Sequence, residues 1–158
     1  MTEVLEGTVD NIKDKELLRR YFFLLHYDKE QDEWSCNTFQ LRNFTPPENY
    51  LSVTRVEISP DAIAHAKKTF HPNKLKKLLG YTVLQTSDVR EINIEKIKLQ
   101  VLADINSIDG HAGIYTWHDD KLVEGGVEEP EILELKKTLF NLAIPTYKAF
   151  PEKSFEDI

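Results

Sequence analysis

The stretch that decides the fold is "ENYLSVTRVEISPDAIAHAKKTF", residues 48–70, because it holds a strand, a helix and the boundary between them. Its first half is rich in β-branched side chains and predicts a strand over residues 51–58. Ser59-Pro60-Asp61 then supplies an N-cap, a proline suited to a first helical turn and an acid for the positive end of the helix dipole. The helix should cover residues 60–70 and end before Pro72, since the residue before a proline avoids the α region.

Similar patterns recur toward the C-terminus. Runs of good β-propensity predict three further strands, near residues 81–87, 97–104 and 112–117. "NKLKKLLG", residues 73–80, is typical of a short helix that Gly80 closes. An apolar stripe that starts at Pro130 predicts a helix over residues 130–142. Because strands and helices follow one another without a repeating βαβ rhythm, the sequence predicts an α+β fold whose mixed or antiparallel sheet is covered by a few helices.

The N-terminal part of the chain is ambiguous. "DKELLRRYFFLLHYD", residues 14–28, fits a helical face with Asp14 as N-cap, whereas its Tyr-Phe-Phe run favours a strand. We predict a helix that runs into a strand. The whole chain, residues 1–158, should form a single domain in which residues 1–12 and 151–158, both largely polar, are poorly ordered.

Composition indicates a soluble cytoplasmic protein. The chain has 158 residues, of which 41% are hydrophobic and 30% charged, enough apolar mass for one core without covalent staples. Cys36 is the single cysteine, which is typical of a reducing compartment and excludes an internal disulfide. The first ten residues carry acids where a signal peptide needs bases, and no apolar run is long enough to cross a bilayer. We therefore expect no membrane association.

The net charge of the chain limits the kinds of partner that it can bind. Twenty basic and 27 acidic side chains give a net charge of −7, which disfavours nonspecific binding to nucleic acid or to anionic membrane. One segment has the opposite sign: "HAKKTFHPNKLKK", residues 65–77, contains five lysines and no acid, namely Lys67, Lys68, Lys74, Lys76 and Lys77. These lysines either form a solvated helix face and loop or bind an anionic partner, such as a phosphate or an acidic protein surface.

Common catalytic and cofactor motifs are absent from the sequence. It contains no glycine-rich phosphate loop, no H-E-x-x-H, no C-x-x-C and no G-x-S-x-G. Asp104, Asp109 and His111 lie close together, and residues 118–120 follow, but their spacing matches no metal-ligand motif. We therefore expect neither a metal nor a cofactor. Paired with a histidine, Cys36 would make a nucleophile, but we interpret it as an inert, partly buried side chain.

Three residues remain as candidates for chemistry: Arg55, Glu57 and His111. Alternation along the predicted strand places Arg55 and Glu57 on one face, either as a solvated ion pair or as an anion-binding fork held by its acid. His111 lies beside Gly110 and Gly113 at the start of a strand, where slim neighbours would let a substrate approach. The alternative for His111 is a structural hydrogen bond to a loop carbonyl.

Three stretches together resemble small bacterial domains of unknown function. In those domains an L-S-V-x-R-x-E strand is followed much later by a His-Ala-x-Ile strand. The matching stretches here are "LSVTRVEI" at 51–58, "VLQTSDVREI" at 83–92 and "VLADINSIDGHAGI" at 101–114. One departure is the Ile-Asp-Gly at 108–110, where such domains often have Asn-Pro. The resemblance implies a bacterial source and directs attention to Arg55, Glu57 and His111, but it brings no activity with it.

Two functions fit these observations. The first is a binding protein that regulates or neutralises a partner, such as a basic protein, in the manner of an immunity protein or an antitoxin, since opposite potentials speed association. The second is a small transferase or hydrolase for a phosphorylated or nucleotide-like substrate. In it Arg55 would hold the anion, His111 would act as acid or base and Glu57 would orient one of them. Convergence of the three in one pocket would favour the enzyme, and a flat acidic surface the binding protein.

Overall fold

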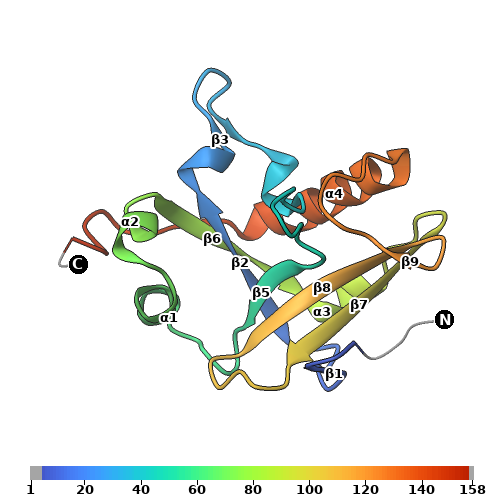
Figure 1. The fold of residues 1–158 in the computed structure, drawn as a ribbon. Helices are drawn as coiled ribbons and strands as arrows, with labels where there is room; N and C mark the ends of the chain where they lie inside the picture. Colours follow the sequence, from blue (N-terminus) through green and yellow to red (C-terminus); the bar gives the residue numbers. More distant parts are fainter. Residues whose placement is uncertain (1–4, 157–158) are drawn as a thin grey trace.

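A computed structural model describes residues 5–156 of the chain, and its centre is an eight-stranded antiparallel sheet (Figure 1). The strand order is β1-β7-β8-β5-β2-β6-β10, and β9 pairs with the free end of β8. The strands of the sheet are β1 (Thr8–Val9), β2 (Leu17–Phe23), β5 (Leu51–Arg55), β6 (Leu78–Gln85), β7 (Ile97–Asp104), β8 (His111–His118), β9 (Lys121–Leu122) and β10 (Lys148–Ala149). A separate hairpin consists of β3 (Tyr27–Asp28) and β4 (Glu33–Trp34).

Four α-helices and three short 3-10 turns connect the strands. The helices are α1 (Ala62–Thr69), α2 (Pro72–Leu75), α3 (Thr86–Arg90) and α4 (Pro130–Ala143), and the 3-10 turns are η1 (Leu24–His26), η2 (Cys36–Phe39) and η3 (Ile144–Thr146). In Figure 1, α1 and α2 lie beside the C-terminal segment, whereas α4 lies apart from them, toward the β8–β9 end of the sheet. The chain is thus a single α+β domain with an antiparallel sheet, as the sequence predicted.

Apolar side chains are buried on both faces of the sheet. The larger core contains Leu18, Phe22 and Ile114, and α4 closes it with Leu135 and Leu139. The smaller core lies on the opposite face, where Ala66 of α1, Leu75 of α2 and the ring of Phe150 pack on Tyr21 and Phe23. Only the half of this second face near β2 and β6 is covered in this way. The half formed by β5, β7 and β8 carries the polar side chains described below.

Strand β2 corrects the prediction for residues 14–28. Its residues form the strand directly, without a preceding helix, and η1 follows. The reason is its position between β5 and β6, where both faces are covered, so that Leu18 and Phe22 are buried on one face and Tyr21 on the other. A strand buried on both faces has apolar residues at consecutive positions, as Tyr21–Phe23 do here after Arg19 and Arg20, and this pattern also fits a helical face.

The predicted helix over residues 73–80, closed by Gly80, was wrong in its extent. Helix α2 ends at Leu75 and β6 begins at Leu78, so Gly80 is part of a strand. A Cβ on Gly80 would overlap the Tyr147 side chain and the Lys148 carbonyl, which explains the glycine by close packing instead of helix capping.

The start of α1 also differs from the prediction. Its N-cap is Asp61, which accepts a hydrogen bond from the Ala64 amide at 3.0 Å. The Ser59 hydroxyl instead donates to the Asp109 carbonyl at 2.6 Å. Strand β5 correspondingly ends at Arg55, because residues 56–58 turn away toward the helix.

The terminal segments contribute to the fold more than the sequence suggested. Thr8 and Val9 pair with Asp104 and Ala103, and Ile12 is buried in the larger core. Near the other end the Phe155 ring packs edge-on against Phe150 with centroids 5.2 Å apart. The remaining residues predicted to be poorly ordered, 1–4 and 157–158, lie outside the described part of the chain. Among the described helices, none combines the length and the apolar character that a bilayer span requires.

Candidate functional site

Arg55, a predicted anion ligand, already has a carboxylate partner within the fold. Its Nε and Nη2 donate to Glu16 Oε1 and Oε2 at 2.7 and 2.9 Å, a bidentate pair in which the Glu16 side chain is only 3% exposed. Burial raises the pKa of Glu16, but the hydrogen bonds from Arg55 and from the Lys13 amide outweigh it and hold the pKa below its ordinary value. Glu57 lies 3.6 Å from Arg55 Nη2 and is well exposed. Arg55 and Glu57 are therefore together, with Glu16 as the main partner.

His111 lies on the opposite face of the sheet from Arg55. In the antiparallel pair of β5 and β8, Thr54 is directly across from His111, and residues directly across share a face. Arg55 follows Thr54 in the strand and so points the other way. The structure brings Arg55 and Glu57 together and separates His111 from both, so the three predicted residues do not form one pocket.

His111 instead connects two polar side chains from its neighbouring strands. Its Nε2 is 3.0 Å from Ser52 Oγ of β5, and its Nδ1 is 3.3 Å from Asp104 Oδ2 of β7. Ser52 is exposed, and the His111 and Asp104 side chains are 35% and 40% exposed. With the ring proton on Nδ1, His111 donates to Asp104 and accepts from the Ser52 hydroxyl. The order serine, histidine, aspartate is that of a nucleophile, a base and an orienting group.

The sequence analysis missed Ser52 and considered Asp104 only as a metal ligand. Period-two alternation did put Ser52 on the face opposite Arg55, but the pairing of β5 with β8 was needed to set it beside His111. Asp104 reaches His111 because β7 pairs with β8 in a register that joins Ala103 to Ala112. The sequence showed only that polar residues lie near the ends of these strands. Which of them meet followed from the strand register.

A recess of about 200 Å³ opens beside this histidine. Its lining residues are Glu6, Gly7, Thr8, Tyr50, Asp104, His111, Ala112, Gly113 and Tyr115. The Tyr50 ring lies against Gly113, where a Cβ would overlap it, so this glycine makes room for a tyrosine and does not expose bare backbone. Tyr50 also contacts the His111 and Tyr115 rings, with centroids 5.7 and 5.0 Å away.

The recess contains the carboxylates of Glu6 and Asp104 and the phenols of Tyr50 and Tyr115. A hydrogen bond from the Asn106 amide and another from His111 lower the pKa of Asp104, which keeps this group ionised. Burial raises the pKa of Tyr115 to about 12, and burial together with the charge of Asp104 raises the pKa of Tyr50. Both phenols therefore stay protonated at neutral pH.

The five predicted lysines differ in their surroundings. Lys68 forms an ion pair with Asp109 at 2.8 Å, and Lys74 Nζ lies 5.0 Å from the ring centroids of both Phe23 and Phe70. Burial lowers the pKa of Lys74. The remaining three, Lys67, Lys76 and Lys77, are exposed. Leu75 and Leu78 anchor the segment in the smaller core, so most of it is a solvated face, and Lys68 and Lys74 already have partners.

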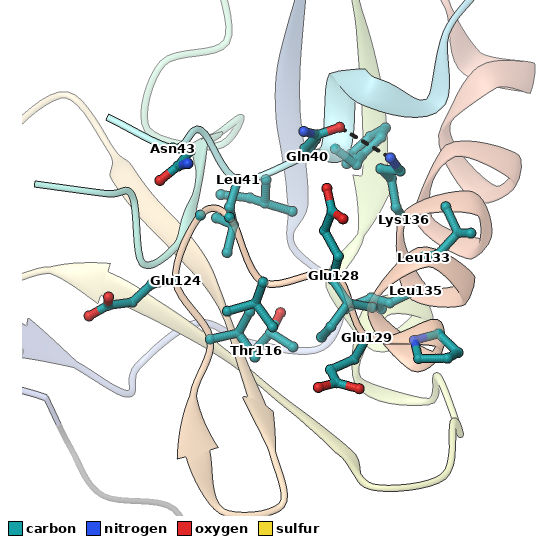
Figure 2. A pocket seen from close by; sticks show the side chains of 18 residues that line it. Gln40, Leu41, Asn43, Thr116, Glu124, Glu128, Glu129, Leu133, Leu135 and Lys136 are labelled. Atoms are coloured by element: carbon teal, nitrogen blue, oxygen red, sulfur yellow. Dashed lines mark hydrogen bonds between the residues drawn. The ribbon is translucent and has the colours of Figure 1, made fainter. Parts of the chain in front are cut away.

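A larger groove, of about 700 Å³, lies between α4 and the loop segments on its flank (Figure 2). Its lining residues are Phe39–Leu41, Asn43, Leu51, Thr116, Val123–Pro130, Ile132, Leu133, Leu135 and Lys136. Figure 2 shows Leu41 and Asn43 on one side, Leu133 and Lys136 of α4 on the other, and Glu128 between them. Buried Leu51, Val123 and Leu135 supply an apolar base, whereas Leu133 and Val127 are exposed by 47% and 42%.

Two glycines shape the wall of this groove. A Cβ on Gly125 would overlap the Arg42 carbonyl, and the Gly125 amide donates to the Glu48 carbonyl at 2.8 Å. Gly126 has φ +97°, in the region that favours glycine. The pair lets the 123–130 segment run close against residues 42–43. Sequence analysis had noted the apolar stripe of α4 but gave no role to the glycine pair before it.

The rim of the groove is acidic. Glu124, Glu128 and Glu129 are exposed, and none of them forms an ion pair with a described residue. The one cation in the lining, Lys136, donates to the neutral side chains of Asn37 and Gln40 at 2.8 and 3.1 Å. The groove therefore combines an apolar base with a surplus of carboxylate charge.

Metal sites and relatives add no further assignment. Within residues 5–156, the structure holds no group of three His, Cys, Asp or Glu side chains that is placed to bind a metal ion. No protein-family model, curated protein or solved structure matches the chain.

Proposed function

We propose that this chain is an acidic binding protein that docks an extended, basic and partly apolar segment of a protein partner in the groove beside α4. The observation that carries the proposal is the combination, in one groove, of exposed Leu133 and Val127 with three carboxylates that form no ion pair within residues 5–156. Exposed apolar side chains that gather in a groove and are edged by charge are typical of recognition sites.

The chemistry of the groove selects the occupant. Its carboxylates attract lysine or arginine, and its apolar base favours aliphatic side chains between them. An extended segment presents alternate side chains to opposite sides, so apolar residues can face the base while basic residues face Glu128 and Glu129. The net charge of −7 adds long-range attraction for a basic protein.

The biological role that fits this chemistry is regulation or neutralisation of a basic partner, as an immunity protein or an antitoxin does, in the bacterial cytoplasm. The single Cys36 suits a reducing compartment. The rival role, in which Arg55 binds a phosphorylated substrate, loses support because the Nε–Nη2 edge of Arg55 already binds the Glu16 carboxylate.

Peptides of defined pattern test the proposal directly. The probe is a short fluorescent peptide of alternating lysine and leucine, and fluorescence anisotropy measures its affinity. Peptides with glutamate in place of lysine, or with serine in place of leucine, should bind at least about tenfold more weakly, since each lacks one half of the recognition. Higher salt should weaken the lysine–leucine peptide.

A pair of matched charge reversals localises the site. Glu128→Lys with Glu129→Lys should weaken the lysine–leucine peptide at least about tenfold. Glu30→Lys with Glu33→Lys changes the net charge equally on the β3–β4 hairpin and should leave most of the affinity. Equal losses in the two double variants, or no binding at all, would overturn the groove as the docking site.

A further inference from the structure

We propose that Ser52, His111 and Asp104 form a nucleophilic site that cleaves small uncharged esters. The site lies on the other face of the sheet from the larger core that α4 closes, so it is independent of the docking groove. His111 and Asp104 line the small recess, and Ser52 lies next to it through its 3.0 Å contact with His111 Nε2.

Three adjacent strands fix the arrangement. Strand β8 lies between β5 and β7, so the His111 ring can contact a side chain from each neighbour. Its Nε2 meets Ser52 Oγ at 3.0 Å, and its Nδ1 meets Asp104 Oδ2 at 3.3 Å. The Asp104 carboxylate is held by the Asn106 amide at 3.0 Å, and the His111 amide donates to Ser107 Oγ at 3.0 Å. Nucleophile, base and orienting carboxylate are therefore each placed by backbone structure and not by a flexible loop alone.

The chemical step follows from this order. Ser52 Oγ attacks the ester carbonyl carbon while its proton passes to His111 Nε2, and the positive imidazolium is stabilised by Asp104. The bond to the leaving oxygen then breaks, that oxygen takes the proton from His111, and the acyl group stays on Ser52. Water repeats the sequence: it gives a proton to His111, its oxygen bonds to the acyl carbon, and Ser52 recovers its proton as the acid leaves.

The recess determines the substrate class. A volume of about 200 Å³ accommodates a short acyl chain and one small leaving group. Tyr50 and Tyr115 give it aromatic walls, which favour an aromatic alcohol. Asp104 and Glu6 line the same recess and repel anions. Short-chain aryl esters without negative charge therefore fit, and phosphorylated substrates do not.

The test uses diisopropyl fluorophosphate, a small neutral reagent that phosphorylates an activated serine and releases fluoride. Intact-mass measurement should show one adduct, and peptide mapping should place it on Ser52. Phenyl acetate should be hydrolysed by the same protein. Ser52→Ala should abolish both reactions, whereas Ser87→Ala, a partly exposed serine at the start of α3, should change neither.

The histidine and aspartate variants distinguish a relay from mere surface reactivity. His111→Asn keeps hydrogen-bonding capacity but cannot take the proton near neutrality, so labelling of Ser52 should slow by about a hundredfold or more. Asp104→Asn should slow it by at least about tenfold. Circular dichroism and thermal unfolding check that each variant is folded. Adducts spread over several serines, an unchanged rate in His111→Asn, or no adduct at all would overturn the proposal, and peptide docking in the groove would be unaffected by any of these results.

Discussion

At the scale of single residues, the direction of a side chain in a strand matters more than its distance along the sequence. Arg55 follows Thr54, which lies directly across from His111, and yet Arg55 and His111 point to opposite faces. Ser52 lies three residues before Arg55 and contacts His111 directly. Each face thus carries its own polar group. One has the bidentate ion pair of Arg55 with Glu16, and the other has His111 with Ser52 and Asp104.

The Glu16–Arg55 pair should be a strong local determinant of stability. Glu16→Gln removes the carboxylate charge beside a largely buried guanidinium, and we expect the free energy of unfolding to fall by about 3 kcal/mol. Glu57→Gln is the matched control, because Glu57 reaches the same guanidinium only from an exposed position and should change the free energy by less than about 0.5 kcal/mol. Urea unfolding measures both, and equal losses would contradict the assignment of Glu16 as the main partner.

The same pair predicts a pH dependence. The pKa of Glu16 is lowered in the folded protein, so its ionised form contributes stability above the pKa of an unfolded glutamate. This contribution is lost as pH falls through the lower, folded pKa. Unfolding free energies measured from neutral to acid pH should therefore fall more steeply in the natural protein than in Glu16→Gln. Parallel curves would show that Glu16 titrates alike in both states.

At the scale of elements, α4 has two different faces. Leu135, Leu139 and Ala143 are buried against the sheet, whereas Leu133 and Leu142 are exposed. Leu139→Ala leaves a cavity in the larger core and should lower the free energy of unfolding by about 3 kcal/mol. Leu142→Ala makes the same chemical change at a site that is 37% exposed and should cost less than about 1 kcal/mol. Denaturant unfolding of the two variants compares them, and similar losses would contradict the packing of α4.

Most elements were predictable from local signals, and β2 was the main exception. Alternation and capping signals located β7, β8, α1 and α4 within a few residues. Strand β2 was misread in part because its apolar residues follow one another on both faces, a pattern shared by a buried helix. Gly80 was taken as a helix end because its actual neighbours, Tyr147 and Lys148, are far away in the sequence.

The candidate sites depend on long-range pairing, which the sequence does not display. Composition and alternation identified His111 as a residue of interest, but Ser52 became its partner only through the register of β5 against β8. The docking groove joins residues 39–43 to α4, segments that are distant in the chain. The glutamates at its rim contribute to the net charge that the sequence shows. Only the fold brings them together around an apolar base.

At the scale of the whole molecule, protection of the backbone should decline from the centre of the sheet toward its edges. Strands β2, β5 and β8 lie at the centre of the strand order, whereas β1 and β10 are two-residue strands at the two ends. Amide hydrogen exchange should therefore be slowest in these three central strands and fastest in β1 and β10. Exchange followed by mass spectrometry or NMR measures this order, and equally slow exchange in β1 and β2 would contradict it.

The strand order also has a consequence for synthesis on the ribosome. Strand β2 leaves the exit tunnel early, but its partners β5 and β6 follow only after long stretches of chain, and β10, which pairs with β6, comes near the very end. The β7–β8 hairpin, in contrast, joins neighbours in sequence and can form as soon as both strands have emerged. We therefore expect β2 to be exposed and unpaired while β5 and β6 are still being made, before either strand of the hairpin has emerged. During that interval β2 is the segment that a chaperone would need to shield from other nascent chains.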